Sequence, residues 1–468
     1  MSIIPGLNDD CVIRTLHFMD TSSLSSMAAT SRAALLLARP LLVRDVCLES
    51  DAQATSFLIM VIIHSLEHAM RTLCLAIGNG IHATPWPVLL GDVLTRTPRL
   101  TRLELWPPRR YPRSIFDSLV NYTPTLTQLC IQSLDIEGAT ALQSVRGLSS
   151  VSLGMDIQRV GRGEYAAMSR MVSAIITGRG NADTLQDVTL FSTINSSAIQ
   201  TGEVRFIGGG AVCPRVARLT IHHISFDLAD VARCFPNVQR LETCQSLAPV
   251  DSLDEGVPWP KLTTLVAPQS LVVPMLAHSD CPLLRCLVVR THYLDLDLRI
   301  NETLDGVRVF DSIQELSLAI PARDPDVGVR DSAAAFLWQV LGSVPNVQKL
   351  DLSVNFERAE LVNLASLTPD TKPRSYTLDE LAYLSLTIDV RQNAEDIQDF
   401  AAIWFTSCPN LTHIRLHAIP DEYRWKRHAA AFEGGSLLNI AVASHCHNSM
   451  LTTIDDEVSA FGSRYPDL

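Results

Sequence analysis

Eleven cysteines and thirteen histidines are the residues of this sequence best suited to metal binding or nucleophilic chemistry. The cysteines are widely spaced, and none forms the C-x-x-C pair that zinc sites and dithiol redox centres use. His445-Cys446-His447 is the densest group of potential ligands, but no second cluster accompanies it. Cys281 and Cys286 also lack a second pair that would complete a zinc site. We therefore predict no metal site and no cofactor.

The patterns that mark common enzyme classes are absent from the sequence. It contains no G-x-S-x-G, no P-loop, no H-E-x-x-H and no complete G-x-G-x-x-G. Serine, histidine and aspartate are plentiful, but no local pattern selects a catalytic trio, which is recognised by its geometry. We predict no catalytic residues and a protein that is not an enzyme; an unrecognised enzyme is the alternative from another class.

Length and composition restrict the architecture and the partners. The chain has 468 residues, more than the roughly 250–300 at which one compact core stops growing, so it forms several domains or an elongated array. Its 38 basic and 50 acidic residues give a net charge of −12, which disfavours a nucleic-acid partner. We identify no signal-peptide pattern, and the longest apolar run, Phe57–Ile63, is far shorter than the about 20 residues that span a membrane. With its dispersed cysteines, the chain is predicted to be cytoplasmic or nuclear, without a membrane partner.

One short pattern recurs through most of the chain. It reads apolar-x-x-apolar-x-apolar, and the interval between copies averages about 28 residues. The last three positions alternate as in a short strand with one buried face. Weaker copies precede the array at Met70–Leu75 and follow it at Leu437–Val442. The clear copies include PRLTRLELW (98–106), PTLTQLCIQ (124–132), PNVQRLETC (236–244), PLLRCLVVR (282–290), PNVQKLDLS (345–353) and PNLTHIRLH (409–417).

Proline and helical patterns separate the copies. In eight copies a proline stands two residues before the first apolar position, where it ends the preceding element. Helical periodicity runs into these strands at 164–176, 332–341 and 395–405. Residues Cys213, Cys281 and Cys408, each just before a proline, are predicted to be small buried hydrophobes. The repeating unit is thus a helix, a proline stop and a short strand, and such units stack on their neighbours.

The array resembles the leucine-rich-repeat family, of an irregular kind with long helical segments. The resemblance covers roughly residues 70–445, although the family's asparagine after the strand occurs properly only once, as Asn355. The implied fold is α/β: a leucine-rich-repeat solenoid with a curved parallel sheet and helices on its convex side. An ordinary α/β domain with coincidental strands is the alternative. We expect the solenoid over 46–445 and a cap or tail over 446–468.

The first 45 residues do not repeat, and they predict three short helices. Asn8 or Asp9 can cap a helix with an apolar stripe, and Asp20 begins the next turn and cap. A third apolar segment, from Ala33 to Leu42, is expected to end near Pro40. A bundle this small lies at the edge of independent stability, so it should need a partner or the array that follows.

These N-terminal residues resemble an F-box. The family's opening Leu-Pro-x-Asp/Glu corresponds to Leu7-Asn8-Asp9-Asp10, and its Ser-Arg to Ser31-Arg32. The sequence departs from the family at Asn8, where proline is usual, and at Ala34, where tryptophan is common. An F-box followed by leucine-rich repeats is a known family architecture.

The resemblance implies a substrate-recognition subunit of a ubiquitin ligase. In that family the F-box binds a Skp-type adaptor of a cullin ligase, and the repeats hold a protein substrate. The alternatives are packing of the same N-terminal side chains against the first repeat, and a leucine-rich-repeat interaction scaffold without ligase association. The implied adaptor-binding residues are Leu7, Asn8, Ile13, Leu16 and Leu24.

Target binding would use the strand face that carries no helices. The middle residue of each strand and the residue two positions further on should face that side, and together they form a mixed, mostly neutral surface. Large aromatic and arginine side chains most often anchor protein interfaces. The predicted target-binding residues are Trp106, Phe191, Arg290 and Arg415.

Overall fold

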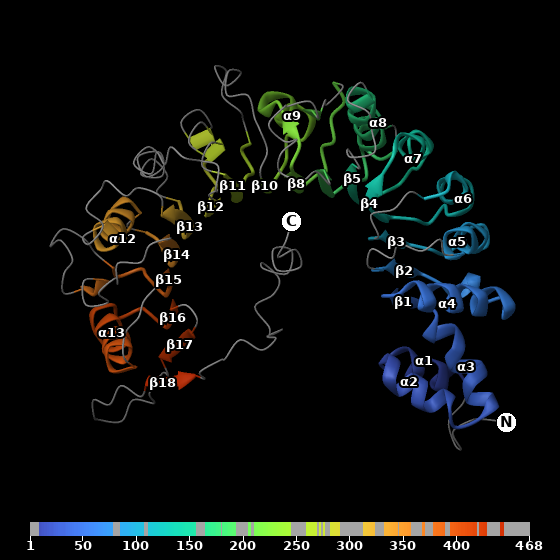
Figure 1. Cartoon of the computed structure of the whole chain (residues 1–468), viewed down its shortest axis with the longest axis horizontal. Helices are drawn as coiled ribbons and strands as arrows, with labels where there is room; N and C mark the ends of the chain where they lie inside the picture. The colour runs from blue at the N-terminus through green and yellow to red at the C-terminus, as the bar shows by residue number, and fades with distance from the viewer. Residues whose placement is uncertain are drawn as a thin grey trace. The chain divides into compact units, whose positions relative to one another are not determined.

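A computed structural model of the chain gives an array of short strands and helices preceded by three helices (Figure 1). The chain divides into two compact units: the first contains the residues up to Asn237, and the second begins at Val238. The structure describes residues 9–77, 85–106, 111–155, 164–178, 180–192, 205–206, 210–244, 259–268, 271–272, 275–276, 281–290, 312–322, 332–344, 346–356, 367–369, 378–388, 394–418, 421–427 and 440–443.

The repeated motifs of the first unit form parallel strands, one in each repeat. Neighbouring strands pair in chain order, and equivalent motif positions are register partners, as Leu73, Leu103 and Leu129 illustrate. The strands are β1 (Asp45–Leu48), β2 (Thr72–Leu75), β3 (Arg102–Leu105), β4 (Gln128–Leu134), β5 (Ser150–Met155), β6 (Asp187–Ser192) and β8 (Arg218–His222).

The second unit repeats this arrangement and then departs from it. Strands β10 to β16 pair in parallel in chain order, whereas β17 and β18 join antiparallel. They are β10 (Arg240–Cys244), β11 (Thr264–Pro268), β12 (Cys286–Arg290), β13 (Glu315–Ala322), β14 (Lys349–Phe356), β15 (Tyr383–Ile388), β16 (His413–Ala418), β17 (Asp421–Arg427) and β18 (Ile440–Ala443).

Helices lie on one face of the sheet within each unit (Figure 1). The three predicted at 164–176, 332–341 and 395–405 are confirmed as α8, α12 and α13. The helices are α1 (Asp9–His17), α2 (Thr21–Ala28), α3 (Arg32–Leu42), α4 (Asp51–Ile63), the short 3₁₀ turn η1 (Glu67–Ala69), α5 (Trp86–Leu94), α6 (Arg113–Tyr122), α7 (Ile136–Leu142), α8 (Tyr165–Thr177), α9 (Leu228–Cys234), α12 (Ser332–Ser343) and α13 (Ala394–Ser407).

The prolines form tight turns before the strands. In the turn over 97–100, the Leu100 N–H donates to the Thr97 carbonyl at 3.2 Å, which places Pro98 at the second turn position that its fixed φ favours. The same contact joins Leu284 to Cys281 at 3.1 Å. Cys213, Cys281 and Cys408 are buried, as small hydrophobes before the turn should be.

One carbonyl in each repeat joins it to the next repeat. The Arg44 carbonyl accepts the N–H groups of Arg71 and Thr72 at 2.8 and 2.9 Å. The Arg71 carbonyl in turn accepts those of Thr101 and Arg102, at 2.8 and 3.1 Å. Each shared carbonyl thus satisfies two backbone donors at the start of the next strand. The same arrangement recurs in the second unit at the carbonyls of Gln239, Thr263, Arg285, Gln314, Gln348 and Ala382.

The N-terminal three-helix module, defined as residues 9–43, forms as predicted apart from the end of its third helix. Asp20 and Ser31 cap α2 and α3, their side chains accepting from Ser23 N–H at 2.7 Å and Ala34 N–H at 3.1 Å. Helix α3 runs through Pro40 to Leu42, so the expected stop near Pro40 is wrong. The carbonyl that loses a donor there belongs to Leu36, a residue that is 61% exposed.

The structure corrects one further expectation. The copy at Leu437–Val442 is not another parallel repeat, because β18 pairs antiparallel with β17. Residues Arg205–Phe206 form β7, which pairs in parallel with β9 (Ser225–Phe226) in a separate two-stranded sheet. Strand β1 lies in none of the predicted copies of the repeat. It begins at Asp45, at the predicted boundary between the N-terminal helices and the solenoid.

Candidate functional site

The N-terminal module has a small core of its own. Val12, Leu16, Leu24 and Ala38 pack together, with Leu16 and Leu24 only 2% and 6% exposed. Ile13, by contrast, is 42% exposed. The structure thus places Leu16 and Leu24 inside the bundle and Ile13 on its surface, whereas Leu7 and Asn8 lie outside the described residues.

The module carries exposed apolar side chains that sequence analysis missed. Phe18 is 91% exposed and Leu36 is 61% exposed, so both leave large apolar areas in contact with water. Exposed apolar groups often mark a protein contact when they form one patch, but these two lie on different segments, Phe18 directly after α1 and Leu36 in α3. The sequence did contain a signal that Phe18 is exposed. It comes two residues after the buried Leu16, directly after α1, and so does not continue the apolar stripe of that helix.

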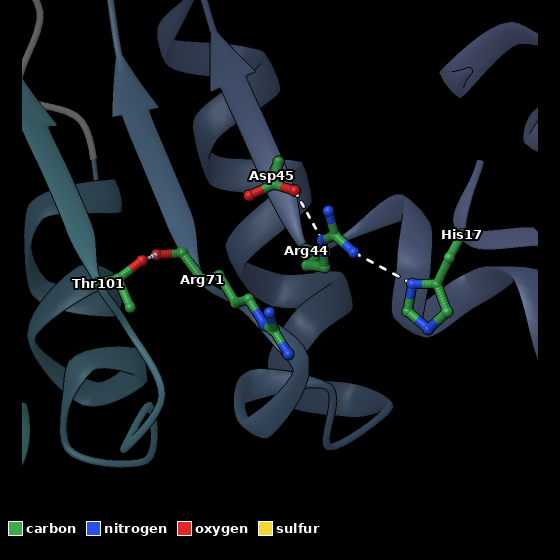
Figure 2. Close-up of polar contacts among 5 residues, drawn as sticks. All are labelled: His17, Arg44, Asp45, Arg71 and Thr101. Carbon is green, nitrogen blue, oxygen red and sulfur yellow. Dashed lines mark hydrogen bonds and ion pairs between the residues drawn. The ribbon is translucent and has the colours of Figure 1, made fainter. Parts of the chain in front are cut away.

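Arg44 links the module to the first strand (Figure 2). Its Nη1–H donates to His17 Nδ1 at 3.1 Å, and its Nε–H donates to Asp45 Oδ2 at 2.7 Å. His17 ends α1 and Asp45 begins β1, so one guanidinium contacts both elements. Figure 2 also shows the next link of the array, where the Thr101 hydroxyl donates to the Arg71 carbonyl at 3.1 Å.

This junction should make stability depend weakly on pH. Burial raises the pKa of Asp45, but hydrogen bonds from Arg44 and Thr72 and the charges of Arg44 and Arg71 outweigh it, so the pKa is lowered overall. A carboxyl whose pKa is lowered by folding stabilises the folded protein at pH values above its unfolded-state pKa of about 3.9. This stabilisation is lost as the pH falls through the pKa of the folded state. We expect Asp45→Asn to cost about 0.5 kcal/mol at pH 7, a small amount because the side chain is 50% exposed.

Urea denaturation of the wild type and Asp45→Asn at pH 7 and pH 3 measures this effect. The difference between the two proteins should be smaller at pH 3 than at pH 7, because the Asp45 carboxylate begins to lose its charge as the pH falls toward its lowered pKa. Asp92→Asn, on exposed α5 surface, is the matched control and should change stability at neither pH. A cost for Asp45→Asn that is equal at both pH values would contradict the assignment.

Alternating burial identifies the strand face without helices in the first unit. In β2 and β3 the leucines are buried, while Cys74 and Glu104 between them are partly exposed. Register places Cys47, Cys74, Glu104 and Cys130 in one row across β1 to β4. We call this row the thiol row. It includes the middle strand positions that were expected to face a target.

Glu104 holds Trp106 in place beside the thiol row. The indole N–H of Trp106 donates to Glu104 Oε2 at 2.9 Å, and the Nε–H of Arg102 donates to Glu104 Oε1 at 2.6 Å. Burial raises the pKa of Glu104, but these donors, the Arg102 charge and the Cys74 thiol together lower it. Glu104 is therefore an ionised acceptor, and Trp106 presents a partly exposed ring with a fixed orientation.

Phe191 depends on a glycine on the neighbouring strand. Gly154 and Phe191 are register partners, and a Cβ at Gly154 would lie 2.4 Å from the Phe191 ring and 2.0 Å from the Gln132 carbonyl oxygen. The β4–β5 register shifts between Ile131 and Leu134, beside that carbonyl. The close approach of backbone and ring therefore requires glycine.

Gly154→Ala is expected to destabilise the first unit by about 1–3 kcal/mol, because the backbone at Gln132 cannot move aside as a flexible side chain would. Differential scanning calorimetry should show a lower melting temperature. Gly91→Ala is the matched control, since its nearest neighbour, the Ser114 hydroxyl, would lie 3.4 Å away and alanine favours its helix. Equal melting temperatures for wild type and Gly154→Ala would contradict this account.

Arg290 in the second unit is engaged by a buried carboxylate. Its Nη2 donates to Glu242 Oε1 at 2.9 Å, while Arg240 donates to Glu242 Oε2 at 3.3 Å. Glu242 is 7% exposed, so the two arginines compensate a charge that water barely reaches. A target that used Arg290 would compete with this pair, and its target-binding role stays a prediction.

Arg415 lies in a cationic strip that sequence analysis missed. It faces Arg424 across the antiparallel β16–β17 pair, and Lys426 lies two pairs further along, opposite His413. We define the cationic strip as Arg415, Arg424 and Lys426; two acidic residues, Asp421 and Glu422, begin the same strand opposite Ala418 and His417. The signal was the alternation of Tyr423 and Trp425 with basic residues, which predicts a strand. The mostly neutral surface expected from sequence therefore has a basic end.

The described residues contain no candidate metal centre, and two of their half-buried thiols are weakly acidic. No group of three or more His, Cys, Asp and Glu side chains there could hold a metal ion, and His445-Cys446-His447 lies outside them. Burial raises the pKa of Cys130 to about 12 and that of Cys286 to about 11, so both thiols remain protonated near neutral pH. The helices of the described chain are all too short or too polar to cross a bilayer.

Comparisons with known proteins add little to these observations. No protein-family model and no curated protein matches the chain. A crystal structure of a Bacteroides fragilis protein aligns with 62% of this chain and 75% of its own, at 12% identity and a TM-score of 0.30. The TLR13–ssRNA13 complex aligns with 70% of this chain, at 13% identity and a TM-score of 0.33; this chain covers 50% of the TLR13 chain. At these scores the repeat assignment depends on the sequence pattern and the strand register.

Proposed function

We propose that this protein is a substrate receptor that performs no chemistry itself. Its N-terminal module would bind a Skp-type adaptor of a cullin ubiquitin ligase, and its strand faces would bind a protein target. Holding the target near the ligase raises the effective concentration of the two reactants, and this proximity is the mechanism.

The observation that carries the proposal is the module's combination of a minimal core and exposed apolar groups. The buried cluster consists of Val12, Leu16, Leu24 and Ala38, with six partly buried apolar residues packed against it, while Phe18 on the same module is 91% exposed. Such a core provides little stability, so a partner that covers this surface would stabilise the module. The F-box resemblance at Leu7–Asp10 and Ser31-Arg32 supplies the identity of that partner.

The target surface would combine an aromatic anchor and a basic end. Trp106 is partly exposed and oriented by Glu104, which favours it as an anchor. The cationic strip at β16–β17 favours an acidic or phosphorylated segment of a target protein, because arginine binds carboxylate and phosphate groups with two parallel hydrogen bonds. The two surfaces lie in different units and are separate proposals for contact.

Binding of the full-length chain to a purified Skp-type adaptor tests the proposal. We expect a complex with a Kd in the micromolar range or tighter, and co-purification of the adaptor and cullin with the tagged protein from cells. No binding at micromolar adaptor would overturn the ligase role.

A second candidate function is a protein-interaction scaffold without ligase association. The departures from the F-box pattern favour it: Asn8 replaces a proline, and Ala34, where tryptophan is common, is fully buried. Under this alternative, targets bind the strand faces normally and the adaptor does not bind. Capture of the same cellular proteins by wild type and by a chain lacking residues 1–43 would support it.

A further inference from the structure

The first two strands of the array bring two cysteines together on the face without helices. Cys47 and Cys74 are direct register partners in the parallel pair β1–β2. Their neighbours Leu48, Leu73 and Leu75 are buried, so both thiols are on the opposite, open face. Cys47 is exposed and Cys74 is partly exposed.

Spacing permits a covalent bond between them. Neighbouring strands lie about 4.8 Å apart, and disulfides join Cα atoms about 4.4–6.8 Å apart. Cys130 lies in the same thiol row, but β3 with Glu104 separates it from Cys74. At about twice the strand spacing it is too far away to compete. Cys213 and Cys234 form another close pair, but both are buried from an oxidant.

The two thiols are chemically unequal. Burial, the hydrogen bond to Cys47 and the Glu104 carboxylate all raise the pKa of Cys74 well above its usual range. Cys74 therefore stays protonated near neutral pH, and an oxidant reacts first with the more accessible Cys47. Cys74 is then held next to the oxidised sulfur, in the position of a resolving cysteine.

We propose that Cys47 and Cys74 are a redox modification site, forming a reversible disulfide across β1 and β2 when the protein meets a peroxide. Cys47 takes one oxygen from hydrogen peroxide to become a sulfenic acid, releasing water. The Cys74 sulfur then attacks Cys47, forms the S–S bond and releases a second water. Overall, two thiols and one hydrogen peroxide give one disulfide and two waters. A thiol reductant reverses the reaction by exchange.

The bond would strengthen the start of the array. Strand β1 is an edge strand, paired only with β2 among the described strands, and its loop back to β2 contains α4 and η1. Arg44, which contacts His17 of the module, directly precedes β1. Oxidation would therefore link β1 covalently to β2 in the repeat next to the N-terminal module. This effect does not depend on whether that module binds an adaptor.

Peptide mapping of the native full-length protein tests the site. After hydrogen peroxide treatment and blocking of free thiols, we expect the linked Cys47–Cys74 peptide to exceed every other cysteine pair at least tenfold, and dithiothreitol to remove it. Hydrogen exchange at residues 44–48 should slow at least threefold. Cys130→Ser is the matched control and should leave the yield unchanged, whereas Cys47→Ser should abolish the linked peptide.

Two results would overturn the proposal. One is accumulation of sulfinic or sulfonic acid at Cys47 without the linked peptide; the other is a linked peptide that forms only in denaturant. The rate of disulfide formation in Glu104→Gln is a second readout, which would not change if the two cysteines were merely close together. Removing the carboxylate charge lowers the pKa of Cys74, so the disulfide should form at least threefold faster from the same sulfenic acid. An unchanged or slower rate would contradict the role given to Cys74.

Discussion

Replacing Asn181 with leucine is expected to lower the free energy of opening around β5 and α8 by about 3 kcal/mol. Asn181 is 1% exposed and follows α8. Its Nδ2 group donates to the carbonyls of Val145 and Ile175, both at 2.9 Å, and its Oδ1 accepts the Leu148 N–H at 3.2 Å. Leucine would leave three buried backbone groups without these partners, and each unpaired group costs about 1–3 kcal/mol.

Native-state hydrogen exchange at the amides of β5 and β6 measures this loss within the full-length protein. It reports local opening, which a single unfolding transition of a chain with two compact units does not resolve. Asn121→Leu is the matched control, because that asparagine is exposed and donates to the Asp117 carbonyl in its own helix. Equal exchange rates in Asn181→Leu and wild type would show that these hydrogen bonds contribute nothing to stability.

The strands of the array were predictable because their residues repeat. The apolar pattern at Leu103 and Leu105 recurs with the same spacing, and parallel pairing follows when each copy stacks on the next. Pro98 and its equivalents marked the start of each strand through turn chemistry that depends only on local backbone geometry. These features are encoded within about ten residues of each other.

Contacts that do not recur from repeat to repeat could not be predicted from the sequence. Asn181 bonds to residues as distant as Val145, and no second copy of that arrangement signals it. The asparagine position of the leucine-rich-repeat family is filled properly only at Asn355. The shared carbonyls at Arg44 and Arg71 join repeats instead, and any residue type can supply a carbonyl. A backbone hydrogen bond that every residue type can accept leaves no pattern in the sequence.

The candidate surfaces were predictable only in part for a related reason. The alternating strand pattern placed Trp106 and Arg415 on the open face, but the partners of Arg290 and Phe191 depend on Glu242 and Gly154 in neighbouring strands. The F-box pattern grouped Ile13 with Leu16 and Leu24, although burial separates them. A shared apolar type cannot distinguish a core residue from a docking residue.

The double variant Ile13→Ser with Phe18→Ser is expected to weaken adaptor binding about 30-fold, which corresponds to about 2 kcal/mol. The two side chains are 42% and 91% exposed, so the change removes apolar contact area without opening the module's core. Isothermal titration of the full-length chain with a Skp-type adaptor measures the change. Circular dichroism of the same samples should show an unchanged helix content.

Two further variants separate docking from folding. Val88→Ser alters another exposed apolar residue, 62% accessible on α5 outside the module, and should leave the affinity unchanged. Leu16→Ser alters the core and should reduce both adaptor binding and module stability, because the buried cluster is so small. If Ile13→Ser with Phe18→Ser binds like wild type while Leu16→Ser does not, the adaptor does not use this exposed surface. Docking would then have to involve residues before Asp9 or another face of the module.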